Sequence, residues 1–319
     1  MALSTRRWPG DQAQSPAQIP PRGWWDVVKR AFKESSADNV SVLAGGVAFF
    51  AFLALFPALI AALTLYGLLA DPAQVAQQID GLASALPPPT RELLSGQLTA
   101  LTENSSGALT TGLIISLLAA LWSASSGTNS LIAAINVAYD ERETRGFLKQ
   151  RLTALVLTMG AVVFVLVAVA LIAGVPVLLD YLGLDTLGRL VAQAGRWVLL
   201  VVMFLFGLAV LYRVAPDREA PQFRWVSPGS VVATFLWLLG SVAFSLYVNF
   251  FGNYGATYGA LTGVIVLMLW LYLTSFIVLL GAEINAEAER QTVKDSTTGE
   301  PLPMGRRGAV AADTVARSE

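Results

Sequence analysis

The sequence contains no cysteine and no histidine among its 319 residues, and it has little charge of either sign. Without cysteine the chain has no disulfide, no thiolate nucleophile and no zinc–thiolate or iron–sulfur site. Without histidine it has no imidazole for acid–base catalysis, haem ligation or a histidine metal site. The net charge of −1 disfavours nucleic-acid binding, which uses a basic surface. Hydrolytic enzymes of the usual kinds are therefore not expected, and we predict no metal and no cofactor.

The charged residues make up only 13% of the chain and are gathered between long uncharged stretches. A soluble protein has about a quarter of its residues charged, whereas 55% of this chain is apolar. A run of about 20 apolar residues is long enough to cross a bilayer as a helix. We therefore predict an all-α, polytopic membrane protein, a bundle of six transmembrane helices. The predicted spans are residues 40–69, 110–136, 152–178, 196–213, 227–250 and 258–284.

Basic residues are distributed unevenly over the segments between these spans. The two termini and the loops 137–151 and 213–225 hold 18 Lys and Arg residues, and the alternate loops hold 3. Lys and Arg favour the cytoplasmic side of a membrane. The split therefore predicts a multi-pass protein with both termini in the cytoplasm.

Residues 24–38 form a predicted amphipathic helix before the first span. Trp24, Val28 and Phe32 share one helical face while basic residues lie elsewhere, which fits a cytoplasmic helix lying on the inner leaflet. A helix that packs on the protein's own cytoplasmic loops has the same periodicity, so both interpretations stay open.

The chain outside the spans has three further parts. Residues 72–104 form the largest outward-facing loop, where apolar residues at helical spacing flank Pro87-Pro88-Pro89, and this pattern predicts two amphipathic helices. Residues 1–23 and 291–319 are polar and rich in proline, glycine or charge, which predicts disordered ends on either side of a membrane domain of residues 39–290.

Several groups of residues stand out from generic membrane helices. They are Leu43–Phe50 with Leu55-Phe56-Pro57, Trp122–Asn129 with Asn136–Tyr139, Tyr212–Pro216, and Tyr254–Gly259 with Gly281–Glu287. Through them, residues 25–290 resemble the YihY/BrkB family of bacterial inner-membrane proteins, and only the termini depart from it. The resemblance implies six spans in the inner membrane and a link to serum resistance and to export of envelope lipid or lipopolysaccharide. Members have also had a ribonuclease BN label, which this sequence contradicts because such RNA hydrolysis needs a histidine-containing metal cluster.

The second predicted span has an unusual number of polar side chains. The candidate pathway residues are Ser123, Ser125, Ser126, Thr128, Asn129 and Asn136. Polar groups are costly in hydrocarbon, so the cluster predicts either the lining of a substrate pathway or hydrogen bonds that hold helices together. Both interpretations stay open.

Acidic residues follow the longest uncharged run. Glu283 and Glu287 are one helical turn apart, with Asn285 between them. A buried Glu283 would be a candidate for coupling proton movement to transport. A carboxylate at the cytoplasmic rim, paired with Arg213 or Arg151, is the alternative.

Small residues and one proline suggest points of helix packing or bending. Gly255, Gly259 and Gly263 are spaced by four, a pattern that lets two helices approach closely. Gly45 and Gly46 lie in the first span together with Pro57, where a packing contact, a kink or a hinge is expected.

These features favour a protein that handles or transports a lipid or lipopolysaccharide precursor in the cell envelope. The alternative is a membrane scaffold that organises an envelope complex and transports nothing. A membrane-embedded enzyme is the weakest hypothesis, because no histidine or intramembrane lysine is available to activate a serine. The expected partners are membrane lipids and further copies of the chain or envelope proteins, with no nucleic acid.

Overall fold

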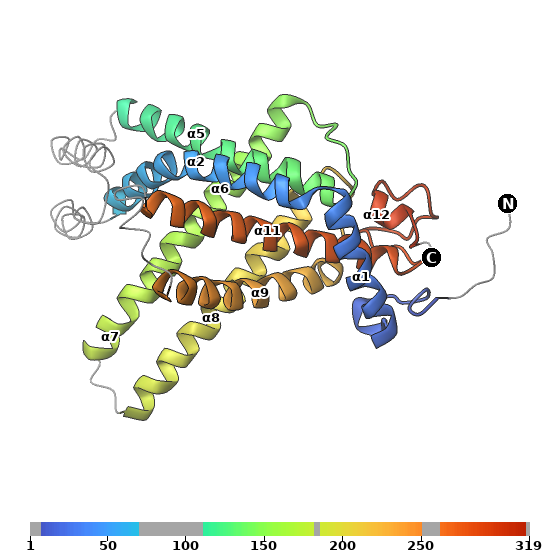
Figure 1. Ribbon diagram of the computed structural model, residues 1–319. Coiled ribbons are helices and arrows are strands. Elements are labelled where there is room, and N and C mark those ends of the chain that lie inside the picture. The colour runs from blue at the N-terminus through green and yellow to red at the C-terminus, as the bar shows by residue number, and fades with distance from the viewer. Residues whose placement is uncertain (1–7, 70–110, 182–185, 251–261, 317–319) are drawn as a thin grey trace. The chain divides into compact units, whose positions relative to one another are not determined.

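The computed structural model describes residues 8–69, 111–181, 186–250 and 262–316. Most of them are helical (Figure 1). The helices are η1 (Pro16–Gln18), α1 (Pro21–Ala37), α2 (Val40–Leu69), α5 (Thr111–Ala138), α6 (Phe147–Val169), η2 (Ala170–Gly174), α7 (Val175–Tyr181), α8 (Thr186–Val214), α9 (Phe223–Phe250), α11 (Thr262–Arg290) and α12 (Val310–Asp313). The helices predicted within 72–104 lie outside the described residues.

Four of these helical stretches are long and apolar enough to cross a membrane. They are Phe147–Gly174, Leu187–Val214, Phe223–Val248 and Thr262–Arg290. A fifth span is possible if α1 and residues Val40–Leu55 of α2, which meet at 68°, count as one broken span. The prediction of an all-α, polytopic membrane protein is thus confirmed, whereas a count of six spans is not confirmed by the described residues.

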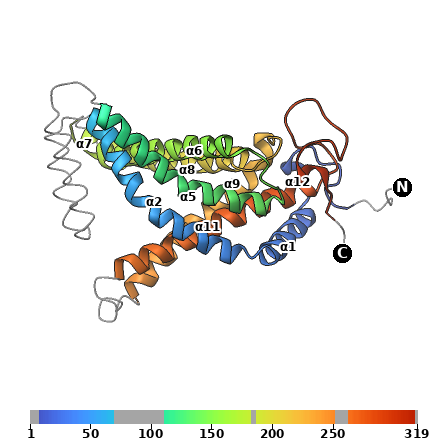
Figure 2. The ribbon, with the colours of Figure 1, turned by 90° about the horizontal axis from the view of Figure 1, so that it is seen from above.

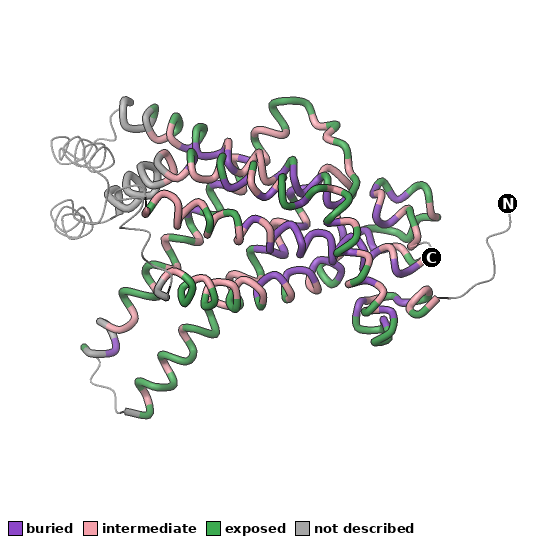
Figure 3. The backbone as a smooth tube through the Cα atoms, viewed as in Figure 1, coloured by how far each residue is buried: buried purple, intermediate pink, exposed green. Residues whose placement is uncertain are grey.

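The chain divides into two compact units. The first consists of Met1–Phe49, Asn129–Thr153 and Leu199–Glu319, and the second of Phe50–Thr128 and Ala154–Val198. In the first unit α11 packs along α9 and against α1. The burial is concentrated in the second half of α11, where every residue from Ile277 to Glu289 is buried (Figure 3).

Two glycines allow α9 and α11 to cross closely in the first unit. A Cβ atom added to Gly281 would lie 2.9 Å from the Cβ of Ala233 and 3.0 Å from the carbonyl oxygen of Gly229. Gly229 is equally constrained, because its own Cβ would meet the Gly281 carbonyl oxygen. The hydroxyl of Tyr212 on α8 donates to the Val278 carbonyl at 2.8 Å and fixes a third helix to the same place.

In the second unit, a different glycine brings α2 and α5 together. A Cβ at Gly127 would lie 3.0 Å from the Cβ of Ala54 and 3.2 Å from the Phe50 carbonyl oxygen. One residue later, the hydroxyl of Thr128 hydrogen-bonds that of Thr158 on α6 at 2.7 Å. Small and hydroxylated residues therefore join three helices here.

The glycines predicted from sequence occupy different surroundings. Beside Gly45, Gly46 and Gly263 no described atom lies within 4 Å of an added Cβ, so the structure does not place them at helix contacts. Gly255 and Gly259 lie outside the described residues. Pro57 is inside α2, which runs without interruption from Val40 to Leu69.

The predicted disorder of the two ends is not what the structure shows for residues 8–23 and 291–316. Arg307 is buried and donates hydrogen bonds to four carbonyl groups, and Asp295 accepts from the backbone of Thr297 and Leu302. The four carbonyl groups belong to Val293, Lys294, Leu302 and Ala312. The Val293 amide donates to Asp11, which joins the two ends to each other. Polar composition suggested disorder, but these polar groups satisfy one another within the fold.

Candidate functional site

The candidate site lies at the end of α11 in the first unit, where α1 packs against it. Ala31 of α1 contacts a cluster formed with Leu280 and Ile284 of α11, and Trp24 covers the cluster. Val27 and Ala31 are one helical turn apart on α1 and both are buried, so they mark the side of α1 that packs. The predicted face of Trp24, Val28 and Phe32 is divided: Trp24 packs on this cluster, Val28 is half-buried and Phe32 is exposed.

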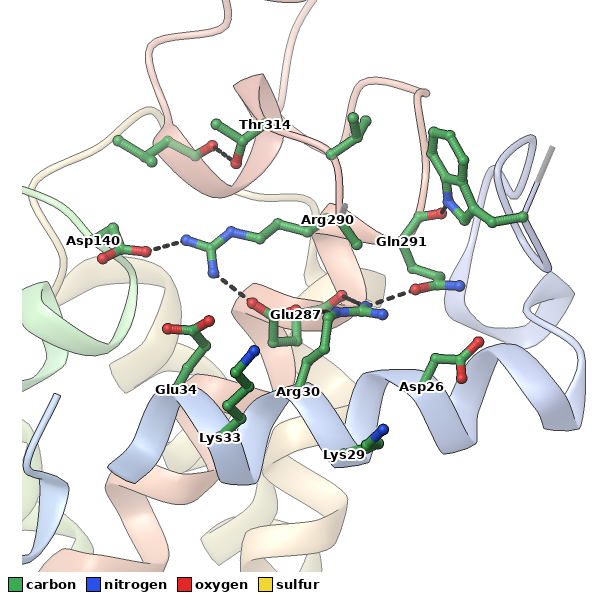
Figure 4. A pocket seen from close by; sticks show the side chains of 14 residues that line it. Asp26, Lys29, Arg30, Lys33, Glu34, Asp140, Glu287, Arg290, Gln291 and Thr314 are labelled. Atoms are coloured by element: carbon green, nitrogen blue, oxygen red, sulfur yellow. Dashed lines mark hydrogen bonds and ion pairs between the residues drawn. The ribbon is translucent and has the colours of Figure 1, made fainter. Parts of the chain in front are cut away.

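Two arginines hold the buried carboxylate of Glu287. The Nε of Arg30 donates to its Oε2 at 2.6 Å, and the Nη1 of Arg290 donates to its Oε1 at 2.5 Å. Arg30 also reaches the side chain of Gln291 at 2.6 Å, and Arg290 also pairs with Asp140 at the end of α5 (Figure 4). These charge-assisted bonds fix α1, α5 and α11 relative to one another within this unit.

Beside this network is a cavity of about 760 Å³. Figure 4 shows α1 along one side of it and Arg290, Glu287 and Thr314 on the others. The charged lining contains equal numbers of cations and anions, which are Lys29, Arg30, Lys33, Arg290, Asp26, Glu34, Asp140 and Glu287. The other walls come from Trp8, Gln291 and the segment from Val310 to Ala316. The lining therefore combines balanced charges with apolar surface from Trp8 and the segment after α11.

Glu283 and Asn285 lie deeper along α11. Glu283 is only 1% exposed, and its Oε1 has no hydrogen-bond partner among the described residues. Of the two arginines predicted to pair with Glu283 at the rim, Arg213 has its guanidinium over the ring of Phe223, 4.3 Å from its centroid. A pairing with Arg151 stays a prediction. The carboxylate held by arginine is Glu287, one turn later.

Asn285 has a structural role at the crossing of α9 and α11. Its Oδ1 accepts a hydrogen bond from the Gly229 amide at 2.7 Å, which joins α11 to α9. Its Nδ2 and the hydroxyl of the neighbouring Tyr139 have no hydrogen-bond partner among the described residues.

Carboxylates also crowd the junction between α1 and α2. Burial raises the pKa of Asp38 from its usual 3.8 to about 6, and repulsion from Asp140 and Glu34 adds to the effect. Since the folded protein binds more protons than the unfolded chain between these two values, stability falls as pH rises from about 4 to about 6.

An Asp38→Asn variant is expected to be more stable than the unchanged protein at neutral pH, by about 2 °C in the midpoint of thermal unfolding. The half-exposed position keeps the effect small because solvent screens the repulsion. The advantage should disappear near pH 3, below both pKa values, where Asp38 is mostly protonated in both states. Unfolding in detergent at the two pH values measures it, and an equal gain at both would contradict the assignment.

The polar residues predicted on the second span are divided between the two units. In the second unit the hydroxyls of Ser125 and Ser126 donate to carbonyls of their own helix, at Trp122 and Ser123. Ser123 is exposed and Asn129 is half-buried, and Thr128 bonds to Thr158. Three of the six candidate pathway residues thus have partners in α5 or α6.

Asn136 belongs to the first unit. Its Nδ2 donates to Glu143 Oε2 at 3.0 Å, and its Oδ1 accepts from the Asp217 amide at 2.8 Å. The hydrogen bonds from Arg145 lower the pKa of Glu143 below its usual 4.5, so this carboxylate stays charged at neutral pH. Asn136 therefore ties the end of α5 to two connecting segments.

Several residues of the site were missed by sequence analysis. Arg30 and Arg290 entered only in the count of basic residues between spans, and Asp140 did not enter at all, although Glu287 and Arg290 have the three-residue spacing of a helical ion pair. The partner from α1 could not be found because 257 residues separate Arg30 from Glu287. Among the described residues, no group of three or more acidic side chains is arranged to hold a metal ion.

Comparison with known proteins supports the family. A family model described as "Virulence factor BrkB" matches residues 31–303. The ribonuclease-like protein YfkH of Bacillus subtilis is 38% identical over 248 residues, which cover 75% of this chain and 86% of that protein. A UPF0761 membrane protein of Idiomarina loihiensis is 32% identical over 93 residues, 29% of this chain and 32% of that protein.

A UPF0761 membrane protein of Yersinia pestis is 35% identical over 97 residues, 29% of this chain and 33% of that protein. No solved structure matches the chain. The family model covers most of the sequence, from the last turns of α1 through α11 and into the segment that follows it. Together with the apolar helices, this match shows that the chain is an integral membrane protein of the BrkB/YihY family.

Proposed function

We propose that this protein handles lipids in a bacterial inner membrane, by moving or presenting a phospholipid or lipopolysaccharide precursor. The observation that supports this best is the charged cavity next to exposed aromatic residues of α1. Its volume of about 760 Å³ lies within the range of small-molecule sites. A lipid has a charged headgroup and apolar chains. The charged cavity suits the headgroup, and the exposed aromatic surface of α1 suits the chains.

The same proposal includes six spans with both termini in the cytoplasm. In addition to the four apolar stretches, α2 and α5 have 30 and 28 residues. At 1.5 Å per residue each is about 40 Å long or more, enough to cross the hydrocarbon core of about 30 Å. The excess of Lys and Arg in the alternate segments supports the orientation. The cavity then opens on the cytoplasmic side.

An enzymatic role is not part of the proposal. The chain has no histidine and no cysteine, and YfkH's description as ribonuclease-like applies to that protein. Transport would take its energy from a partner, from a proton gradient through a carboxylate such as Glu283, or from the lipid gradient itself.

Transbilayer movement of a labelled phospholipid, and of a lipopolysaccharide precursor, in sealed liposomes with purified protein tests the proposal. Thr314 is exposed and lines the cavity, so Thr314→Trp is expected to fill it and slow movement about tenfold, the effect of about 1.4 kcal/mol of lost binding. Leu302→Trp, exposed and outside the cavity lining, is the matched control and should leave the rate unchanged.

Two further arms separate the sequence-based hypotheses. If α5 lined the pathway, Asn129→Ala would abolish movement, whereas the cavity proposal expects it to be retained. A requirement for a proton gradient that disappears in Glu283→Gln would identify proton coupling. The cysteine-free chain also allows Glu300→Cys to be labelled with an impermeant reagent, which reports on which side the tail lies.

A non-transporting scaffold is the second candidate. The hydroxyls of Ser125, Ser126 and Thr128 are already bonded within helices, which is the behaviour expected of packing residues rather than a pathway. Absence of movement of either lipid by folded protein would favour the scaffold, with envelope proteins or further copies of the chain as partners.

A further inference from the structure

The exposed side of α1 combines basic and aromatic residues. Arg22, Trp25, Lys29, Phe32 and Lys33 are all exposed, and at 100° per residue they fall within an arc of about 100°. Trp25 is 71% exposed and Phe32 is 55% exposed. We call these five residues the basic–aromatic stripe.

The other sides of α1 are accounted for by the fold. Val27 and Ala31 are fully buried on the side of α11. Asp26 and Glu34, the two acidic residues of α1, are half-buried and line the cavity (Figure 4). The stripe therefore has a positive charge, and its two large aromatic residues have no packing role that would explain them.

The direction of α1 suits a surface helix. It meets the following stretch Val40–Leu55 at 68°, and Figure 2 shows the chain turning there. When α2 crosses the bilayer, a helix at this angle runs closer to the membrane plane than to its normal. Aromatic rings favour the level of the lipid headgroups, and Lys and Arg are attracted by anionic lipids there.

We propose that the basic–aromatic stripe binds the anionic phospholipids of the adjacent leaflet and enriches them around α1. Each basic residue near an anionic membrane surface raises binding about fivefold, so three of them can select anionic over zwitterionic lipid. Lys29 and Lys33 also line the cavity, so the enriched lipids lie at its mouth. The inference holds whether or not the protein moves lipids.

Ser36 lies on the same side of α1 as the stripe and offers a position for a probe. It is exposed, and its hydroxyl bonds only to the Phe32 carbonyl of its own helix. Ser36→Cys gives the cysteine-free chain a single thiol for an environment-sensitive nitrobenzoxadiazole label. The labelled full-length protein is placed in liposomes of phosphatidylcholine and phosphatidylglycerol. Two samples are compared, one with brominated phosphatidylglycerol and one with brominated phosphatidylcholine as the quencher, and the mole fraction of brominated lipid is the same in both.

Brominated phosphatidylglycerol is expected to quench the label more strongly than brominated phosphatidylcholine, and salt should reduce the difference. The combined variant Arg22→Gln, Lys29→Gln and Lys33→Gln should lose about tenfold or more of the preference. Neutralising three exposed cations elsewhere, Arg224→Gln, Lys294→Gln and Arg306→Gln, should leave it intact.

Two results would overturn the inference. One is that, in the protein with its stripe unchanged, the two brominated lipids quench the label equally or neither quenches it. This comparison does not require any charge variant to fold. The other is a preference that survives in the stripe variant at the level of the control. A protein that shows the preference but moves no lipid would contradict the proposed function alone.

Discussion

Replacing Gly281 by alanine is expected to lower the free energy of unfolding by about 3 kcal/mol, because α9 and α11 would have to separate. The new Cβ would lie 2.9 Å from the Cβ of Ala233 and 3.0 Å from the carbonyl oxygen of Gly229, and it would also meet the Tyr212 hydroxyl. A backbone oxygen cannot rotate away as a side chain can. In an open helical position the same substitution stabilises a helix by about 1 kcal/mol, so the crossing reverses the usual sign.

Thermal unfolding of the purified protein in detergent measures this effect. Gly207→Ala is the matched control, because Gly207 lies within α8 and no described atom lies within 4 Å of its added Cβ. The control is expected to be as stable as the unchanged protein or slightly more so. If Gly281→Ala unfolded at the same temperature as Gly207→Ala, the close crossing of α9 and α11 would be refuted.

The positions of the apolar helices could be predicted because each depends on a local property, a long run of uncharged residues. The prediction of 40–69 coincides with α2, and that of 227–250 differs from α9 by four residues at its start. The glycine contacts could not be assigned in this way. Gly229 and Gly281 have no distinctive spacing within their own helices, whereas the regular Gly255-Gly259-Gly263 pattern includes Gly263, which has open space beside it.

The candidate site was predicted only in part, because its ion pairs connect distant segments. Sequence analysis selected Glu287 and Asn285 through their position after a long apolar run, and both are buried in the site. It could not supply Arg30 or Asp140, which reach α11 from α1 and α5. In the sequence Arg30 was only one of the basic residues on the cytoplasmic side, and only the fold shows that it pairs with Glu287 and that Asp140 pairs with Arg290.

The segment after α11 illustrates the same limit. Its composition resembles that of a disordered tail, yet Arg307 and Asp295 organise it into a compact structure by bonding to backbone groups. Hydrogen bonds between side chains and the backbone leave no periodic pattern in a sequence. Such a segment is recognised only when the partner of each polar group is known.

A deeper ion pair in the same region gives the second large effect. Arg218 donates to both carboxylate oxygens of Glu289, at 3.1 and 2.7 Å, and both side chains are fully buried. The Ser296 hydroxyl donates to the same carboxylate at 2.5 Å, and the guanidinium lies 5.1 Å from the ring centroid of Tyr139. The pair therefore joins the segment after α8, the end of α11 and the segment that follows it.

Arg218→Met is expected to destabilise the protein by about 3–5 kcal/mol, because it leaves the Glu289 carboxylate buried without its cation. The double variant Arg218→Met with Glu289→Leu should recover much of this loss, since it removes both charges. Asp140→Asn, at the half-exposed pair with Arg290, should cost about 1 kcal/mol or less. Unfolding in detergent of the unchanged protein, the single variants Arg218→Met and Glu289→Leu, and the double variant gives the coupling energy, and Asp140→Asn is measured beside them. A double variant less stable than Arg218→Met would contradict this. It would show that the contacts of the pair with Ser296 and Tyr139, rather than charge compensation, hold these segments together.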